Sequence, residues 1–152
     1  MIKLDRTLTY RLHLLHKLTD AVSHRAYVSG AGLSMSDGRC LTAVGTFAPL
    51  SVNDLAKKAN LNKGQASRAA QSLAGQGLVL KAASPTDGRG VVLTLTSEGQ
   101  SAWQRAMDVV TQRNKDIFGV LGADEQTQLS SFFDRLIDQA RAGGEVAEDS
   151  DD

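Results

Sequence analysis

The stretch that decides the fold is "LSVNDLAKKANLNKGQASRAAQSLAGQGLVLKAASPTDGRGVVLTLTSEGQ", residues 50–100. It begins with Ser51-Val-Asn-Asp54, which has the spacing of a capping box, where a side-chain oxygen accepts from a free N–H at a helix start. This spacing predicts a short helix of about two turns. Apolar residues recur on one side of that helix and are expected to face inward: Val52, Leu55, Ala56 and Ala59. Asn60-Leu-Asn62 then breaks the helix and caps the next one.

The second predicted helix, over residues 63–75, is amphipathic, with small residues on one face and polar residues on the others. A stripe of small residues suits close packing against a neighbour: Ala66, Ala69, Ala70 and Leu73. Polar residues project from the other faces: Lys63, Gln65, Ser67, Arg68 and Gln71. Gly75 and Gly77 supply the stop signal for this helix.

Two candidate strands follow, over residues 78–83 and 91–96, and the second is rich in β-branched residues. Their composition favours strands, and the proline and glycines between them mark a turn. The sequence therefore predicts a β-hairpin that carries Asp87 and Arg89 near its tip.

Amphipathic helices flank this segment on both sides. Apolar residues recur at steps of three and four over residues 6–28, and again over 97–121 and from 124 onward. Ser34-Met-Ser-Asp37 has capping-box spacing and predicts a helix that ends at Phe47.

The predicted order is a long helix, three shorter helices, a β-hairpin and two further helices. This order predicts a mainly α fold, a winged helix-turn-helix with a β-hairpin wing and long terminal helices. The chain length suits one domain, which we place at residues 1–142. Within it, the winged-helix lobe covers about 36–96 and the long helices cover about 6–28 and 97–142.

The net charge of zero hides an uneven distribution. The last eight residues carry five carboxylates and no base, so residues 1–144 have a balance of +5. Residues 51–91 hold six bases against two acids, which is the electrostatic footprint of a nucleic-acid binder, although an ordinary solvated surface is also compatible with it. The glycine pair at 143 and 144 is expected to end the last helix, and the acidic tail over 143–152 is expected to be disordered.

The composition also argues against several classes of protein. No window has the roughly 18 uninterrupted apolar residues of a membrane span, and charges stand where a signal peptide needs an apolar run. We therefore expect a cytoplasmic protein without a membrane partner. Cys40 is the single cysteine, which excludes an internal disulfide and a thiolate-only metal cage. No cofactor and no metal site are expected.

A set of short motifs appears in order along the stretch: Leu55-Ala56, Ser67-Arg68, Gly77-Leu78-Val79, Asp87-Gly88-Arg89 and Leu95-Thr96-Ser97-Glu98-Gly99. Together with the helix order, they resemble the multiple antibiotic resistance regulator (MarR) family of bacterial transcription factors, over about residues 5–142. Two features depart from the family pattern. Gly88 replaces a usual Arg or Lys, and Lys63-Gly64-Gln65 replaces the more usual serines and threonines.

The resemblance implies a DNA-binding transcriptional regulator, most often a repressor, whose helix over 63–75 enters a major groove. Gln65 and Arg68 are the candidate base readers, because amide and guanidinium groups pair with purine edges. Lys63 and Ser67 are candidate phosphate contacts. Arg89 is expected to reach a neighbouring minor groove, held in place by Asp87; a surface ion pair in a generic turn is the alternative.

A homodimer is the expected assembly. Three phenylalanines (Phe118, Phe132 and Phe133) and the leucine stripe over residues 6–28 exceed what a small winged-helix core covers, although they can also pack within one chain. Members of the resembling family dimerise through their terminal helices. A two-fold dimer matches double-stranded DNA with a pseudopalindromic operator.

The resemblance also implies release from DNA by a small aromatic or phenolic carboxylate. Tyr10, Arg11 and His13 lie within two turns of the first predicted helix, and Ser34 and Arg39 belong to the next one. Such residues can bind a carboxylate beside an apolar seam. Helical histidines and arginines are, however, usually solvated or paired with a neighbouring chain.

Three other functions are weighed against this one. Cys40 can serve as a redox sensor, but its apolar neighbours favour a buried, inert thiol. Cys40 and the histidines have the residue types of a nucleophile and its base, but no motif orients them, so no enzyme is expected. A winged helix that binds only protein is the third alternative, and the basic charge of residues 51–91 argues against it.

Overall fold

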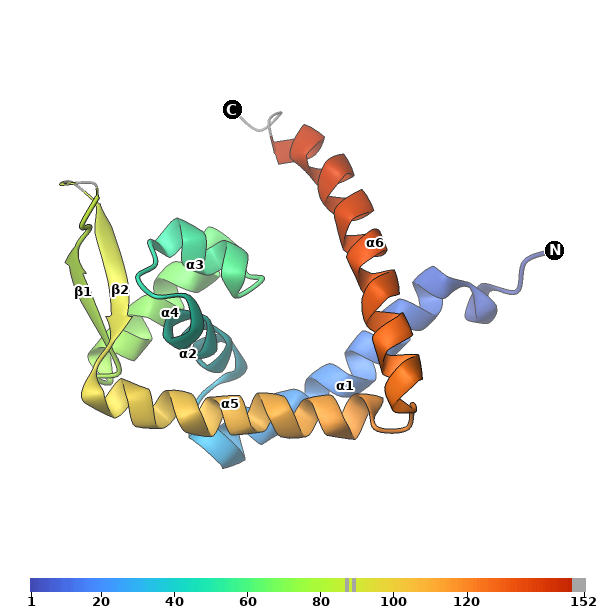
Figure 1. Ribbon diagram of the computed structural model, residues 1–152, viewed down its shortest axis with the longest axis horizontal. Helices are drawn as coiled ribbons and strands as arrows, with labels where there is room; N and C mark the ends of the chain where they lie inside the picture. Colours follow the sequence, from blue (N-terminus) through green and yellow to red (C-terminus); the bar gives the residue numbers. More distant parts are fainter. Residues whose placement is uncertain (87, 89, 149–152) are drawn as a thin grey trace. The chain divides into compact units, whose positions relative to one another are not determined.

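The computed structural model describes residues 1–86, 88 and 90–148, with side chains as far as Gly144 (Figure 1). After a short 3₁₀ helix at Leu4–Arg6, the described elements are α1 (Leu8–Ala31), α2 (Met35–Phe47), α3 (Val52–Lys58), α4 (Lys63–Gly75), β1 (Val79–Ala83), β2 (Val91–Leu95), α5 (Ser97–Phe118) and α6 (Ala123–Glu148). This order confirms the predicted mainly α fold with a winged helix-turn-helix.

The chain forms two compact units, Met1–Arg113 and Asn114–Asp152. The first holds α1 to α4, the hairpin and most of α5, and the second holds the end of α5 together with α6. The first unit therefore contains more than the predicted winged-helix lobe, since α1 and α5 cluster with it.

The core of the first unit lies where α2, α3, α4 and β2 meet. Its largest fully buried side chains come from all four elements: Cys40, Leu41, Val44, Leu55, Leu73 and Leu93. The small-residue stripe of α4 is buried along its whole length, as the sequence predicts: Ala66, Ala69, Ala70 and Leu73. Small side chains allow α4 to lie close to α2 and α3, because little side-chain volume separates the helices.

The predicted caps are present at three helix starts. Ser34 Oγ accepts from Asp37 N at 3.2 Å, and Ser51 Oγ accepts from Asp54 N at 3.1 Å. Asn62 begins α4 with a complete capping box, the strongest of the three. Each cap satisfies a backbone donor that the helix itself leaves without a partner.

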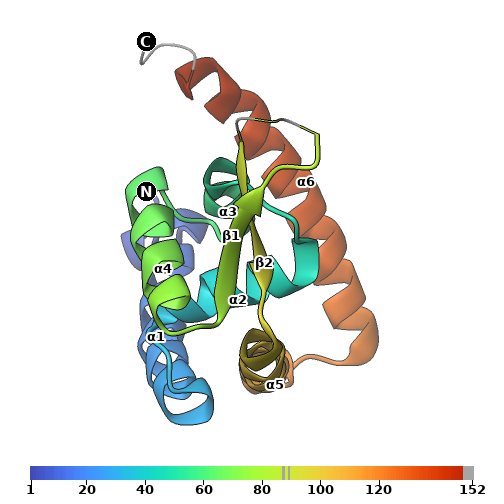
Figure 2. The same cartoon turned by 90° about the vertical axis from the view of Figure 1, so that its left-hand side faces the viewer.

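The wing is an antiparallel hairpin that stands beside α4 (Figure 2). Its register pairs Val79 with Leu95 and Ala83 with Val91. Leu50 adds an isolated bridge to Leu93, which ties the segment before α3 to the hairpin. Thr96 caps α5, because its Oγ1 accepts from Gly99 N at 2.9 Å.

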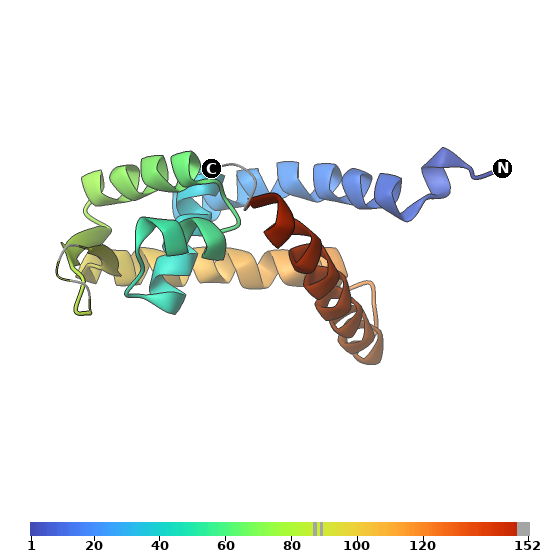
Figure 3. The same ribbon diagram turned by 90° about the horizontal axis from the view of Figure 1, so that it is seen from above.

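Helices α1 and α5 run side by side in the first unit (Figure 3). Arg113 Nε donates to Ser23 Oγ at 3.0 Å, and the bare Cα of Gly30 faces the side chain of Val109. Also on α5, Trp103 Nε1 donates to the backbone oxygen of Thr42 at 3.2 Å, which joins α5 to α2.

The end of α6 differs from the prediction. The helix continues through Gly143 and Gly144 to Glu148, so the helix end predicted at the glycine pair is wrong. Glycine in a helix costs about 1 kcal/mol relative to alanine, which weakens a helix without ending it. Residues 149–152 lie outside the described part of the chain.

Candidate DNA-binding and ligand-binding sites

The first turns of α4 present three of the predicted DNA contacts to solvent. Lys63, Ser67 and Arg68 are exposed, while the opposite side of the same helix is buried in the core. The sequence pattern thus separates the packing face of α4 from its polar face. The polar face carries two positive charges at the end of the helix that a major groove admits first.

Gln65 takes part in the cap of α4, and its role as a base reader stays a prediction. Its Oε1 accepts from Asn62 N at 3.1 Å, and its backbone N donates to Asn62 Oδ1 at 2.8 Å. Two-pronged pairing with adenine needs both the oxygen and the nitrogen of the amide. While the capping box is closed, Gln65 can offer only its Nε2 group to a base. The Asn-x-x-Gln spacing is itself a capping-box signal that sequence reasoning missed.

Gly64 leaves room for the guanidinium group of Arg68. A Cβ atom on Gly64 would lie 3.3 Å from Arg68 Nη1 and 3.4 Å from Asn62 Oδ1. The side chain of Arg68 therefore lies back over the first turn of α4, against the bare Cα. A larger residue at position 64 would have to displace this arginine.

The two predicted wing residues, Asp87 and Arg89, lie outside the described residues. Below them, the hairpin is closed by a hydrogen bond from Ser84 N to Gly90 O at 2.9 Å. Their roles in DNA binding stay predictions from the sequence.

Two further basic residues are exposed within the helix-turn-helix segment. Lys57 and Lys58 are exposed at the end of α3, directly before the turn that leads into α4. Lys58 Nζ lies 4.6 Å from the ring centroid of Phe47, a cation–π distance. The charge balance of residues 51–91 includes both lysines, but the predicted DNA contacts omit them.

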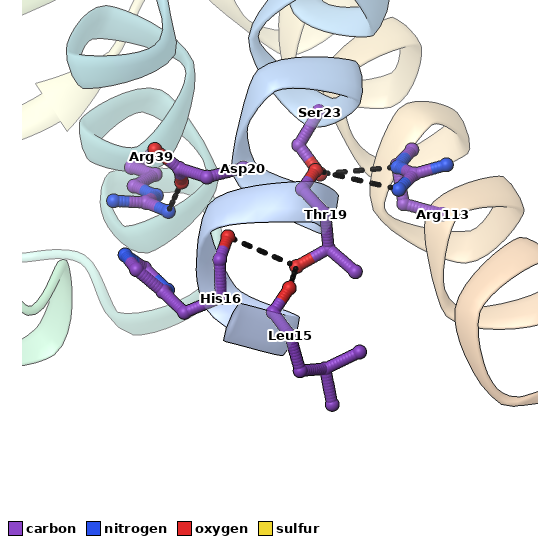
Figure 4. Close-up of polar contacts among 7 residues, drawn as sticks. All are labelled: Leu15, His16, Thr19, Asp20, Ser23, Arg39 and Arg113. Atoms are coloured by element: carbon purple, nitrogen blue, oxygen red, sulfur yellow. Dashed lines mark hydrogen bonds and ion pairs between the residues drawn. The ribbon is translucent and has the colours of Figure 1, made fainter. Parts of the chain in front are cut away.

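The predicted ligand residues are not gathered into one site. Tyr10, Arg11 and His13 are exposed on α1, and the Ser34 hydroxyl is engaged in capping α2. Arg39 instead pairs with Asp20, at 3.2 Å between Nη2 and Oδ1 (Figure 4).

A shallow, open surface depression of about 580 Å³ lies along α1, beyond the predicted residues. Its lining carries four basic groups and one carboxylate: His16, Lys17, Asp20, Ala21, His24 and Arg25. Figure 4 shows His16 on the same side of α1 as Asp20, near Arg39. The lining residues and Arg39 together form what we call the basic face, whose positive groups favour an anion.

The Asp20–Arg39 ion pair is weak enough for another anion to replace Asp20. The side chains are 40% and 37% exposed, and exposed ion pairs of this kind contribute little to stability. Tyr27 is buried next to this region. Burial raises the pKa of Tyr27, and the charge of Arg39 lowers it in part, so the phenol stays neutral at physiological pH.

Cys40 is fully buried, as predicted. Burial raises the pKa of its thiol to about 11, and the nearby charge of Asp37 acts in the same direction. Little thiolate is present at neutral pH, and the thiolate is the reactive form. The side chain therefore lacks the features of a redox sensor.

The second unit has a cavity of its own, of about 290 Å³. Apolar and amide groups line it together: Asn114, Phe118, Gln126, Leu129, Ser130 and Phe133. Among the residues that the structure describes, no cluster of histidine, cysteine and carboxylate side chains has the makings of a metal site. In the same part of the chain, no helix is long and apolar enough to cross a membrane.

Comparisons with known proteins agree with the winged helix-turn-helix fold. Residues 31–90 match the model of the MarR family. The match covers α2, α3, α4 and β1, the segments that form the helix-turn-helix and the start of the wing. A comparison with curated proteins finds no match.

Solved structures of MarR-family regulators share the fold. A MarR/EmrR family transcriptional regulator from Acinetobacter sp. ADP1 is 23% identical, with a TM-score of 0.82 over 93% of this chain and 99% of that one. The Mycobacterium tuberculosis MarR family protein Rv2887, in complex with p-aminosalicylic acid, is 25% identical, with a TM-score of 0.68 over 86% and 98%. BpsR from Bordetella bronchiseptica, whose DNA binding is regulated by 6-hydroxynicotinic acid, is 17% identical, with a TM-score of 0.80 over 91% and 98%.

Proposed function

We propose that this MarR-family chain is a homodimeric, sequence-specific repressor that a small aromatic carboxylate releases from its operator. The single observation that carries the proposal is the division of α4, which buries its alanine face and exposes Lys63, Ser67 and Arg68 beside a β-hairpin. A helix held in this way can enter a major groove while the hairpin reaches the adjacent backbone. Repression then follows from occlusion of the promoter.

Dimerisation is supported by two apolar faces that the chain leaves exposed. On α1, Leu8, Leu12 and Leu18 are 80%, 63% and 60% exposed. On α6, Leu136 and Ile137 are 65% and 44% exposed. Contiguous apolar surface of this kind marks protein–protein interfaces. A second copy of the chain covers both faces by two-fold symmetry and sets two α4 helices about one DNA turn apart.

Effector binding is supported by the basic face of α1 and α2. A ligand carboxylate replaces Asp20 as the partner of Arg39, because the existing pair is half-exposed and weakly held. An aromatic ring beside the carboxylate matches the ligands of the two solved relatives, p-aminosalicylic acid and 6-hydroxynicotinic acid. Release requires that the ligand prefer a dimer whose α4 spacing no longer fits two successive grooves.

The experiment that tests this function is selection of DNA from a random duplex pool by the purified full chain. The expected outcome is an enriched motif of two inverted half-sites about one DNA turn apart. Arg68→Ala should relax the selected sequence, because a guanidinium group reads a base edge. A pool that stays random over repeated rounds would contradict sequence-specific binding. Protein-only binding by the winged helix would then be the better interpretation.

A further inference from the structure

Asp37 lies in the first turn of α2, and its carboxylate reaches the last turn of α4. Its Oδ2 accepts from Ser72 Oγ at 2.6 Å and from Gln76 Nε2 at 3.3 Å. Gln76 Nε2 also donates to Ser72 Oγ at 3.1 Å. The three side chains form a closed triangle of hydrogen bonds between the start of α2 and the end of α4, which we call the α2–α4 triangle.

Local helix stability does not explain this triangle. A carboxylate stabilises the N-terminus of α2, but Asp37 would do so without any contact to α4. At the C-terminus of α4 a carboxylate is unfavourable, because the carbonyl end of a helix carries negative partial charge. The hydrogen bonds that Ser72 and Gln76 donate offset this unfavourable interaction of the Asp37 carboxylate. The triangle therefore connects α2 to α4, and its role is not to stabilise either helix alone.

The buried side of α4 explains why such a tie is useful. The buried face of α4 is mostly alanine, with Leu73 as its larger side chain, and apolar burial is not directional. Alanines alone set how closely α4 approaches α2, but they do little to fix its rotation or sliding. Hydrogen bonds depend steeply on distance and angle, so the triangle can fix both.

We infer that Asp37 is a positioning residue, which fixes the orientation of α4 on α2 and thereby the base contacts of both half-sites. The inference rests on the proposed DNA-binding function. A misoriented α4 keeps its positive charge and therefore its non-specific affinity for phosphates. It loses base-edge contacts, which need correct geometry and carry the sequence preference.

The test uses the full chain and fluorescence anisotropy with two duplexes, the selected operator and the same duplex with scrambled half-sites. Ser72→Ala is the main variant, because alanine favours the helix while removing the shortest bond of the triangle. Asp37→Ala removes the acceptor, and Asp37→Asn keeps an acceptor oxygen without the charge. Ser101→Ala, at an exposed serine of α5, is the matched control.

Ser72→Ala and Asp37→Ala should each bind the operator about tenfold more weakly, which is the scale of one charge-assisted hydrogen bond, and bind the scrambled duplex as wild type does. The double variant should lose less than the sum of the two single losses, since both single variants break the Ser72–Asp37 bond. Asp37→Asn should recover part of the operator affinity. Ser101→Ala should match wild type on both duplexes.

Three results would overturn the inference. Unchanged operator affinity would show that the triangle does not position α4. An equal loss of affinity for both duplexes would show an effect on folding or on charge alone. Far-UV circular dichroism distinguishes a folding effect from a charge effect. A loss in Asp37→Asn as large as in Asp37→Ala would assign the effect to charge. If wild type itself fails to distinguish the duplexes, the proposed function fails, which is a different result.

Discussion

Gly45 and Trp103 are in direct contact, because the bare Cα of Gly45 faces the indole ring and a Cβ there would overlap it. The same indole donates from Nε1 to Thr42 O at 3.2 Å, so α5 is fixed on α2 by a close approach and a hydrogen bond. This contact joins a terminal helix to the core of the winged helix. It gives Gly45 a clear packing requirement, because a side chain at this position would overlap the indole.

Gly45→Ala should lower the free energy of unfolding by about 2 kcal/mol, the usual cost of overfilling a packed site. Gly75→Ala is the matched control, since a Cβ there meets nothing within 4 Å and alanine favours the helix. Urea unfolding followed by Trp103 fluorescence measures both. Equal stability of the two variants would show that the indole moves away at no cost.

Asp20 and Arg39 should act in opposite directions on effector binding. Asp20→Asn removes the carboxylate that competes for Arg39, so salicylate, used as a probe, should release DNA at a lower concentration than in wild type. Arg39→Ala should require more salicylate or fail to respond. The measurement is the salicylate concentration that halves operator binding. A response unchanged in both variants would place the effector elsewhere.

The Cys40 thiol should react slowly in the native protein. Its pKa is raised to about 11, so at pH 8 a thiol reagent should label it far more slowly than in urea. The neutral thiol contributes stability that is complete below pH 9 and is lost as pH rises through 11. From pH 8 to pH 10.5, the free energy of unfolding should therefore fall less in Cys40→Val than in wild type. Fast native labelling, or an equal fall in both proteins, would count against burial as the cause.

Dimerisation should depend on the exposed faces of α1 and α6. Leu12→Glu and Leu136→Glu each place a charge on an exposed apolar face, and burying an unpaired charge at an interface is costly. Both variants should sediment as monomers at micromolar concentration, where wild type is a dimer. Leu80→Glu is the control, because Leu80 is 56% exposed on β1, away from those helices in the sequence. A wild-type monomer, or a monomeric control, would contradict this assignment.

Much of the fold follows from local signals in the sequence. The caps at Ser34, Ser51 and Asn62, and the alanine stripe of α4, depend on spacing within one helix, and all are found as predicted. The end of α6 was misplaced because glycine weakens a helix by an amount that its neighbours can offset.

The sites were less predictable because they depend on contacts between helices. The pairing of Arg39 with Asp20 joins residues 19 positions apart, and the α2–α4 triangle joins residues 35 and 39 apart. No periodicity within one helix reports such contacts. The role of Gln65 in capping was readable from its distance to Asn62, but its residue type had suggested a base contact.

Sequence-specific DNA binding is best tested by titrating the full chain against the selected operator and its scrambled version at several salt concentrations. We expect tight operator binding with a steeply negative slope of log K against log salt, and much weaker binding to the scrambled duplex. Lys63→Ala should reduce the slope by about 2, one phosphate contact for each protomer, and Arg89→Ala should weaken binding further. Equal affinity for both duplexes, or a slope near zero, would show that this winged helix does not read DNA.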